Sequence, residues 1–174
     1  MKVLTDLIRD IPDFPEPGIV FKDITPLLGD HNGLQVAVGA LVDHYRDAGV
    51  TEVAGIESRG FIFAAPIALS LAAGFIPIRK PGKLPYDVIR EDYELEYGTD
   101  SLELHKDAVK AGDRVVIIDD VLATGGTAIT AAKLVERLGA TVVGIGVMVE
   151  LEFLGGRQRL EGYDLISLVQ YEQP

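Results

Sequence analysis

The chain has 174 residues, 48% of them hydrophobic, which is enough apolar surface for one globular domain that spans residues 1–174. Its formal net charge of −11 disfavours a nucleic-acid surface, because such a surface needs clustered Lys and Arg to neutralise phosphates. It contains no cysteine, which excludes disulfides, thiolate nucleophiles and Cys-based metal sites and makes a reducing cytoplasm the expected compartment.

The N-terminal stretch MKVLTDLIRDIPDF has acids where a signal peptide would need an apolar run, so we predict no secretion signal. Further along, the stretch Phe61–Ile78 is apolar except for Ser70, and its length alone would allow a membrane-spanning helix. Gly74 and Pro77 interrupt its last third. We therefore favour a buried helix near 61–73, ended by Gly74, and a short buried strand near 75–79.

A pattern of strand, polar loop and helix recurs along the chain. The strand Glu52–Ile56 is followed by the loop Glu57–Gly60 and the apolar helix just described. The strand Arg114–Ile118 is followed by the loop Asp119–Thr127, a helix that ends at Gly139 and the strand Thr141–Leu151. Continuous Val and Ile runs that alternate with helices predict an α/β fold with a mostly parallel central sheet flanked by helices. Ligands bind beyond the carboxyl ends of such strands, so the two loops form the candidate site.

Residues 82–106 depart from this pattern. The stretch from Tyr86 to Tyr93 is charged, and Glu94–His105 alternates with a period of two around Gly98-Thr99-Asp100. We predict a hairpin with a mobile tip. Two interpretations stay open, a solvated ribbon at the edge of the sheet or a lid over the site.

The loop between the second strand and its helix resembles a phosphate-binding turn. Ala123, Thr124, Gly125, Gly126 and Thr127 open the helix, so backbone N–H groups and Thr hydroxyls can converge on an anion at the positive end of the helix dipole. The two glycines let the backbone approach without a Cβ in the way. A Walker A loop needs a lysine where Gly126 stands, so ATP hydrolysis is not supported.

Asp119 and Asp120 precede this turn and would repel a phosphate if they pointed at it. Ribose hydroxyls or a Mg²⁺ ion would both favour two carboxylates, so the combination is typical of a site for a sugar phosphate with a free diol. The alternative is a helix N-cap with buried strand-end acids, which is costly to bury without a task.

The segment Val115–Ala128 resembles the motif of the type I phosphoribosyltransferases that binds 5-phosphoribosyl-1-pyrophosphate (PRPP). Three further segments and a short fourth one resemble the adenine phosphoribosyltransferases in particular. These are Phe14–Leu27, Glu57–Phe61, Arg79–Pro85 and Glu94–Gly98. The resemblance implies transfer of the phosphoribosyl group of PRPP to N9 of adenine, which gives AMP and pyrophosphate in purine salvage.

The same resemblance implies an N-terminal hood, residues 1–30, over the base. Phe21 would pack on the purine ring, and backbone atoms of Val20 and Lys22 would read its edge. Because family members vary between Arg and Lys at position 22, the implied role of Lys22 is through its backbone. A backbone C=O accepts from the 6-amino group and an N–H donates to N1, which suits adenine and not the 6-oxo purines. From the residue alone, Phe21 could equally be a core aromatic.

Four cations follow the strands that carry the first loop and its neighbour: Arg59, Arg79, Lys80 and Lys83. At one end of the sheet of an acidic protein they suit a clamp for pyrophosphate, although Lys80 and Lys83 could be scattered surface charge. The resemblance places Ser58 and Arg59 on pyrophosphate. It also implies that Glu96, with Tyr97, closes over the base and handles the proton at purine N7.

The implied cofactor is Mg²⁺, bound mainly through PRPP, with a water-mediated link to Asp119 or Asp120 left open. The resemblance also implies a homodimer. Two rivals remain at this stage: a related enzyme for xanthine or guanine, and a PRPP-sensing regulator, which would need a DNA-binding module. His31, His44 and His105 lack a partner at ligand spacing and are interpreted as surface residues.

Overall fold

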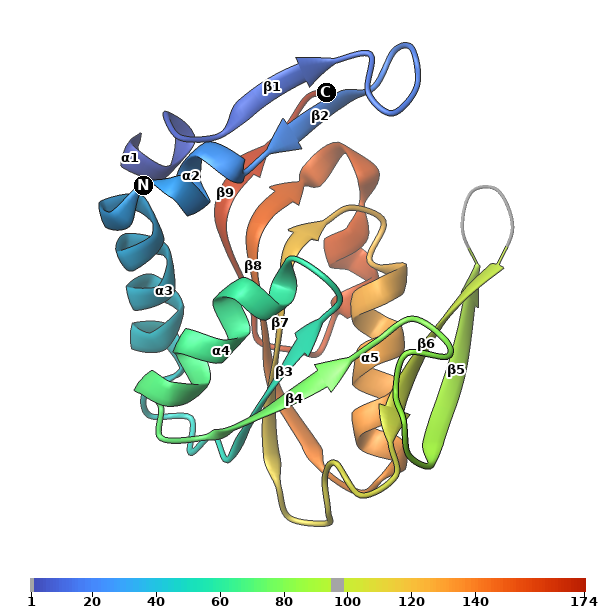
Figure 1. Ribbon diagram of the computed structural model, residues 1–174. Helices are drawn as coiled ribbons and strands as arrows, with labels where there is room; N and C mark the ends of the chain where they lie inside the picture. The colour runs from blue at the N-terminus through green and yellow to red at the C-terminus, as the bar shows by residue number, and fades with distance from the viewer. Residues whose placement is uncertain (1, 95–98) are drawn as a thin grey trace.

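The computed structural model describes residues 2–94 and 99–174 (Figure 1). The helices are α1 (Lys2–Thr5), α2 (Thr25–Gly29), α3 (His31–Tyr45), α4 (Gly60–Ser70) and α5 (Gly126–Arg137), with short 3-10 helices η1 (Glu152–Leu154) and η2 (Gly156–Leu160). The strands are β1 (Arg9–Pro12), β2 (Val20–Asp23), β3 (Glu52–Ile56), β4 (Gly74–Ile78), β5 (Val88–Glu94), β6 (Thr99–His105), β7 (Arg114–Leu122), β8 (Thr141–Leu151) and β9 (Leu165–Tyr171).

The centre of the molecule is a parallel sheet in the order β4-β3-β7-β8-β9. Helices α3 and α4 cover one face, and α5 covers the other, together with the hairpin formed by β5 and β6 (Figure 1). The predicted α/β fold with a mostly parallel sheet flanked by helices is therefore confirmed. Strand β4 lies at one edge of the sheet and contains Pro77.

The strands are apolar throughout because each of their faces meets a different core. Along β7, Val115 and Ile117 pack with α5 and the hairpin, whereas Val116 and Ile118 pack with α3 and α4. All four side chains are fully buried. Burial of one such side chain stabilises the fold by about 1.5–3 kcal/mol, so the two cores together stabilise the packing of the helices on both faces of the sheet.

Several predicted boundaries differ from the structure. Strand β7 continues to Leu122, so Asp119 and Asp120 lie in the strand and not in the loop that follows it. Helix α4 ends at Ser70, and Gly74 is the first residue of β4, so Gly74 does not end the helix. A Cβ on Gly74 would meet the carboxylate at the end of the flexible Glu52 side chain. Helix α3 and strand β9 were not predicted from the sequence.

The N-terminal segment forms a two-stranded antiparallel ribbon, β1 with β2, that joins α1 to α2. Leu4, Ile24 and Leu27 anchor its ends in the core under α3 and α4. Figure 1 shows the ribbon at the top of the molecule, above the ends of β8 and β9. This arrangement fits the predicted hood over residues 1–30, whose role in covering a base stays a prediction.

The segment 82–106 is an antiparallel hairpin, as predicted, with Glu94 paired to Thr99 at its described end. Leu102 and Leu104 are fully buried against the α5 face of the sheet, so the interpretation as a merely solvated ribbon is wrong. Residues 95–98 lie outside the described part of the chain, and the predicted mobility of the tip stays a prediction.

No helix among residues 2–94 and 99–174 is long and apolar enough to cross a membrane. The apolar stretch that raised this alternative consists of α4 followed by β4.

Candidate active site

The predicted phosphate turn is a backbone cradle at the start of α5. Gly125 precedes the helix with φ +80°, a left-handed conformation that favours glycine. Residues 121–128 line a hollow of about 60 Å³. Within the part of the chain that the structure describes, no side chain caps the first turn of α5, so the N–H groups of this turn are open to an outside acceptor. We call residues 123–127 the phosphate cradle, and it can hold an anion through N–H groups and the helix dipole.

Asp119 and Asp120 lie just before the cradle, with only 8% and 7% of their surfaces exposed. The backbone N–H of Asp120 donates to Asp119 over 2.9 Å, and Nε of Arg59 lies 2.5 Å from Oδ2 of Asp120. Burial, and then the charge of Asp120, raises the pKa of Asp119 well above its ordinary value. Neither acid caps α5, so that part of the alternative interpretation is wrong, although both acids are indeed buried at the end of a strand.

A mainly apolar pocket of about 220 Å³ adjoins the cradle. It is lined by Ile19, Val20, Phe21, Lys22, Arg59, Val121, Ala123 and Leu151. The structure thus brings the predicted hood residues and Arg59 together with the cradle. Sequence reasoning missed Ile19, Val121 and Leu151. The signal for Leu151 was available, because it ends a parallel strand at the edge where ligands bind.

Phe21 is half-buried and belongs to neither core, so the alternative of a core aromatic is wrong. Its ring lies edge-on to Phe14 at 5.3 Å and 5.2 Å from the guanidinium carbon of Arg59. An aromatic face stiffened in this way is suited to stacking on a flat ligand.

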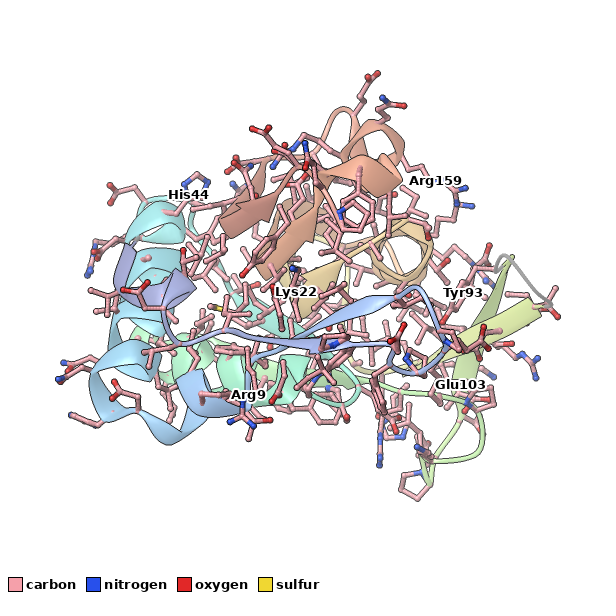
Figure 2. The ribbon with its side chains drawn as sticks, turned by 90° about the horizontal axis from the view of Figure 1, so that it is seen from above. Arg9, Lys22, His44, Tyr93, Glu103 and Arg159 are labelled. Atoms are coloured by element: carbon pink, nitrogen blue, oxygen red, sulfur yellow. The ribbon has the colours of Figure 1, made fainter. Side chains whose placement is uncertain are left out.

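The side chain of Lys22 is only 6% exposed and makes contacts within the protein. Its Nζ lies 2.9 Å from Asp10 and 4.2 Å from the centre of the Tyr171 ring. Figure 2, seen from above, shows Lys22 near the middle of the molecule, away from Tyr93 and Glu103 of the hairpin. Lys22 can therefore contribute to the pocket through its backbone, as the sequence analysis expected.

The four predicted cations do gather at this end of the sheet, so the alternative of scattered surface charge is wrong. Each of them, however, is paired with a carboxylate, which the sequence analysis did not foresee. Glu57 pairs with both Arg79, at 3.2 Å, and Lys83. Arg59 pairs with Asp120, and Lys80 pairs with Asp100. We call Arg59, Arg79, Lys80 and Lys83 the cation cluster.

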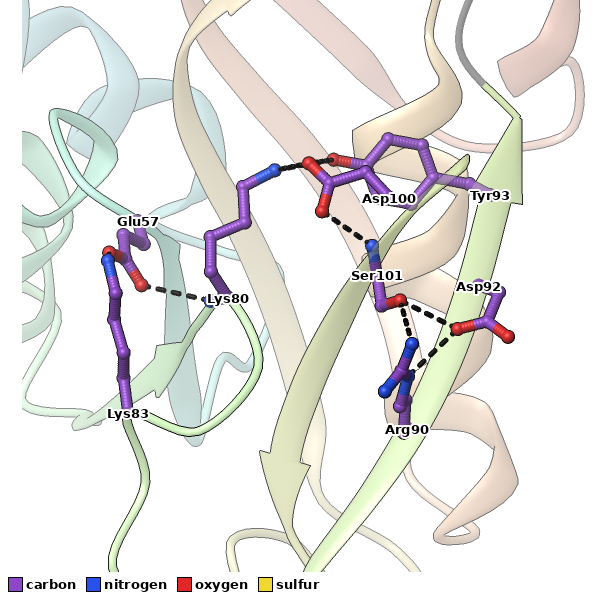
Figure 3. A network of polar contacts seen from close by, with 8 residues as sticks. All are labelled: Glu57, Lys80, Lys83, Arg90, Asp92, Tyr93, Asp100 and Ser101. Atoms are coloured by element: carbon purple, nitrogen blue, oxygen red, sulfur yellow. Dashed lines mark hydrogen bonds and ion pairs between the residues drawn. The ribbon is translucent and has the colours of Figure 1, made fainter. Parts of the chain in front are cut away.

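Glu57 is the centre of this cluster and its side chain is only 8% exposed. Its carboxylate also accepts the backbone N–H of Lys80 over 2.9 Å (Figure 3). Burial opposes the charge of Glu57, but hydrogen bonds from Lys83, Lys80 and Arg79 outweigh burial and hold its pKa below the ordinary value. Glu57 is therefore charged at neutral pH and neutralises part of the cluster.

Lys80 links the cluster to the hairpin. Its Nζ contacts Asp100 of β6 and donates to the hydroxyl of Tyr93 of β5 over 2.8 Å (Figure 3). Burial opposes the charge of Lys80, but its bonds to Asp100 and Tyr93 raise its pKa overall. The hairpin is thus tied by an ion pair to the segment that carries the cations.

The remaining residues singled out from the sequence are Ser58, Glu96, Tyr97 and the three histidines. Ser58 is exposed in the turn between β3 and α4. Glu96 and Tyr97 lie outside the described residues. Of the histidines, the interpretation as surface residues is confirmed for His31 and His44, which are exposed, although the His44 ring lies 2.9 Å from Asp164. It is wrong for His105, which is half-buried beside Tyr86.

Comparison with known proteins identifies the family. A family model described as "Phosphoribosyl transferase domain" matches residues 26–166. Over 173 residues, the chain is 57% identical to an adenine phosphoribosyltransferase of Solibacter usitatus, covering 99% of this chain and 100% of the relative. The chain belongs to the adenine phosphoribosyltransferase family. It is thus an enzyme that transfers a phosphoribosyl group.

Solved structures of this family agree with the fold throughout. The adenine phosphoribosyltransferase of Thermoanaerobacter pseudethanolicus superposes with a TM-score of 0.94 at 52% identity, covering 98% of this chain and 99% of the other. The Saccharomyces cerevisiae enzyme, solved with D-2,5-dideoxy-2,5-imino-altritol 1,6-bisphosphate and adenine, gives 0.91 at 38% identity, covering 96% and 97%. The candidate site therefore lies in the conserved fold of a family whose members include an adenine complex.

Proposed function

We propose that this protein transfers the 5-phosphoribosyl group of PRPP to N9 of adenine and releases AMP and pyrophosphate. The observation that carries this proposal is that Val121 and Ala123 line both the apolar pocket and the hollow at the phosphate cradle. One continuous surface can thus hold a flat base at one end and a 5′-phosphate at the other. Their fixed spacing would orient N9 toward C1 of the ribose, which is the main means of catalysis open to such a site.

Adenine would be selected by the free edge of β2. Among the strands of the described residues, β1 alone pairs with β2, so within this part of the chain the other edge of β2 keeps unpaired N–H and C=O groups. Val20 and Lys22 are two residues apart and so direct these groups the same way. An N–H and a C=O in this arrangement fit N1 and the 6-amino group of adenine and mismatch a 6-oxo purine. Phe21 would then stack on the ring.

The phosphoribosyl part would lie across the end of β7. The cradle would hold the 5′-phosphate, and Asp119 and Asp120 would orient the ribose hydroxyls. Among the described residues, no group of three or more His, Cys, Asp or Glu side chains could hold a metal ion. Mg²⁺ would therefore be held mainly by PRPP oxygens, with Asp119 or Asp120 as added ligands, and would neutralise the leaving pyrophosphate.

Pyrophosphate would bind at the cation cluster and the exposed Ser58. Because Glu57, Asp100 and Asp120 already pair with the cations, binding would exchange internal ion pairs for contacts with the ligand. The proposed roles of Glu96 and Tyr97, proton handling at N7 and cover over the base, stay predictions.

We also propose a homodimer. The outer face of α4 and the edge strand β4 expose Ile62, Leu69 and Phe75, with Leu69 82% exposed. An apolar patch of this kind on a surface helix is typical of a protein interface. Light scattering of wild type and of Leu69→Glu would test it, because the added charge should shift a dimer toward monomer.

The experiment that tests the activity uses isotope-labelled adenine and PRPP, with and without Mg²⁺, and the same assay with hypoxanthine and guanine. We expect AMP to form only with Mg²⁺ and the 6-oxo purines to react at least about 100-fold more slowly, as expected when paired polar groups mismatch. Faster turnover of guanine or hypoxanthine than of adenine would favour the rival enzyme. Retention of the protein on DNA at low salt would favour the regulator.

A further inference from the structure

The phosphate cradle rests against a segment that none of the proposed contacts involves. This segment is η1 and η2 between β8 and β9, drawn in orange-red beside α5 in Figure 1. Gly156, the first residue of η2, is buried against residues 123–125 of the cradle. The contact is one of backbone against backbone.

The fit at this contact leaves no room for a side chain. A Cβ on Gly156 would lie far inside van der Waals distance of the carbonyl oxygen of Ala123 and 2.9 Å from the nitrogen of Gly125. From the other side, a Cβ on Gly125 would lie 2.7 Å from the carbonyl oxygen of Gly156. Both neighbours are backbone atoms, so a side chain could be accommodated only if the loop or the 3-10 helix moved.

Gly156 cannot easily retreat, because the next residue is anchored. Nε and one terminal nitrogen of Arg157 lie 2.9 Å and 2.5 Å from the two oxygens of Glu150, a bidentate pair. Glu150 is 2% exposed and also accepts from Ser167 over 2.5 Å. Leu160 at the end of η2 is 1% exposed in the core beneath α5. The side of the contact that η2 contributes is therefore held from β8, β9 and the core.

The side that moves would be the cradle. Gly125 is one of the residues that line the hollow, and the peptide units of residues 123–125 set the direction of the neighbouring N–H groups. We infer that Gly156 is a positioning residue for the phosphate cradle: it fixes the backbone that binds the 5′-phosphate, and the Glu150–Arg157 pair holds it in place. This inference rests on the proposed function, because it assumes that the cradle binds the 5′-phosphate of PRPP and AMP.

The test is Gly156→Ala, with calorimetric titration of AMP, pyrophosphate and adenine and steady-state kinetics with PRPP. We expect AMP affinity to fall about 10- to 100-fold, as overpacking of a buried contact implies, with pyrophosphate and adenine within about twofold of wild type. The KM for PRPP should rise by a similar factor while kcat changes by less than about threefold. The matched control is Gly39→Ala in α3, where an added Cβ meets nothing within 4 Å and all values should stay at wild type.

A second variant covers the case in which Gly156→Ala does not fold. Arg157→Lys keeps a positive charge beside Glu150 but loses the bidentate pair, so it should loosen η2. We expect the affinity for AMP to fall several-fold and the affinity for pyrophosphate to stay unchanged. Wild-type AMP affinity in a folded Gly156→Ala protein, or equal weakening of all three ligands, would overturn the inference alone. A wild-type protein that binds no AMP would overturn the proposed function and this inference with it.

Discussion

The two regions of the site that are proposed to bind anions, the phosphate cradle and the cation cluster, are built on opposite principles. The phosphate cradle has no charged side chain and offers backbone N–H groups in a shape fixed by Gly125 and the neighbouring η2. The cation cluster offers four charged side chains, each already held by a carboxylate of the same chain. The cradle is thus specified by geometry, whereas the cluster is specified by a balance of charges.

This difference suits two groups with different fates. The 5′-phosphate stays on the sugar through the reaction, so a rigid neutral cradle can hold it unchanged. Pyrophosphate has to leave, and carboxylates that compete for the same cations lower the free energy of its release. The comparison predicts that the cradle responds to added volume and the cluster responds to changes in charge and salt.

The largest effect is expected from a single methyl group in the cradle. Gly125→Ala would force a left-handed conformation on alanine, at a cost of about 1 kcal/mol, and bring the Cβ to 2.7 Å from Gly156. We expect AMP affinity to fall about 100-fold in calorimetric titration, since overpacking adds about 1–3 kcal/mol. Gly112→Ala is a matched control, because Gly112 has φ +94° but an added Cβ meets nothing within 4 Å. Equal AMP affinities in the two variants would break the geometric view of the cradle.

Asp119 lies at the border between the two regions, and Asp119→Asn should raise the stability of the protein and lower its activity. Burial and Asp120 raise the pKa of Asp119, so the folded state holds a proton that the unfolded state releases above the ordinary value of 3.8. Stability of the wild type is therefore lost as the pH rises through this window. The variant lacks this ionisable group, so its free energy of unfolding should exceed that of wild type by about 1 kcal/mol at neutral pH.

The same variant should lose about tenfold in kcat/KM for PRPP, because a neutral amide serves a diol or a hydrated Mg²⁺ poorly. Asp107→Asn, at an exposed position, is the control for the loss of one charge. A variant that is both less stable than wild type and fully active would show that Asp119 has only a structural role.

A smaller effect of opposite sign is expected in the cation cluster. Glu57→Gln keeps an acceptor for the N–H of Lys80 but removes the charge that Arg79 and Lys83 now neutralise. We expect pyrophosphate to bind about fivefold more tightly by titration and AMP to bind as in wild type. Glu161→Gln changes the same net charge at an exposed position and serves as the control. Weaker pyrophosphate binding would mean that Glu57 orients the cations more than it restrains them.

The smallest expected effect is a difference between the two regions in how salt changes ligand affinity. A change from about 0.05 M to about 0.5 M NaCl shortens the range of charge interactions, so pyrophosphate affinity should fall about threefold. AMP affinity should fall less, because backbone donors hold its phosphate. Identical salt slopes for the two ligands would count against the distinction.

Much of the fold could be predicted from sequence because apolar runs and glycines coincide with element ends. Strand β8, Thr141–Leu151, has its predicted bounds, since Gly139 ends the preceding helix with φ +86° and a stretch rich in Val and Ile follows. The predicted end of β7 is too early because Asp119 and Asp120 look like loop residues, although Asp119 pairs with Val147 of β8. Acidic residues inside a strand make a rule based on side-chain polarity fail.

The gathering of the four cations at the candidate site could be predicted from sequence, but their ion pairs could not. The cations were found from their position after strands, whereas their carboxylate partners follow from register, because Ile56 pairs with Ile78 and so brings Glu57 beside Arg79. Asp100 meets Lys80 only through the packing of the hairpin. Gly156 gave no signal at all, because its constraint lies in a contact between backbones more than 30 residues apart, which no local pattern records.

Pro77 in the edge strand β4 has a consequence for the behaviour of the protein in crowded solution. The stretch from Phe75 to Ile78 is apolar and uncharged and forms one edge of the sheet, with Phe75 exposed and Ile76 and Ile78 buried. An apolar edge strand is the kind of segment that templates growth of β-structure between molecules. Proline lacks the N–H that an incoming strand would need, so it interrupts the row of donors at this edge. The residue thereby limits aggregation at the flank where the family's fold leaves a strand open.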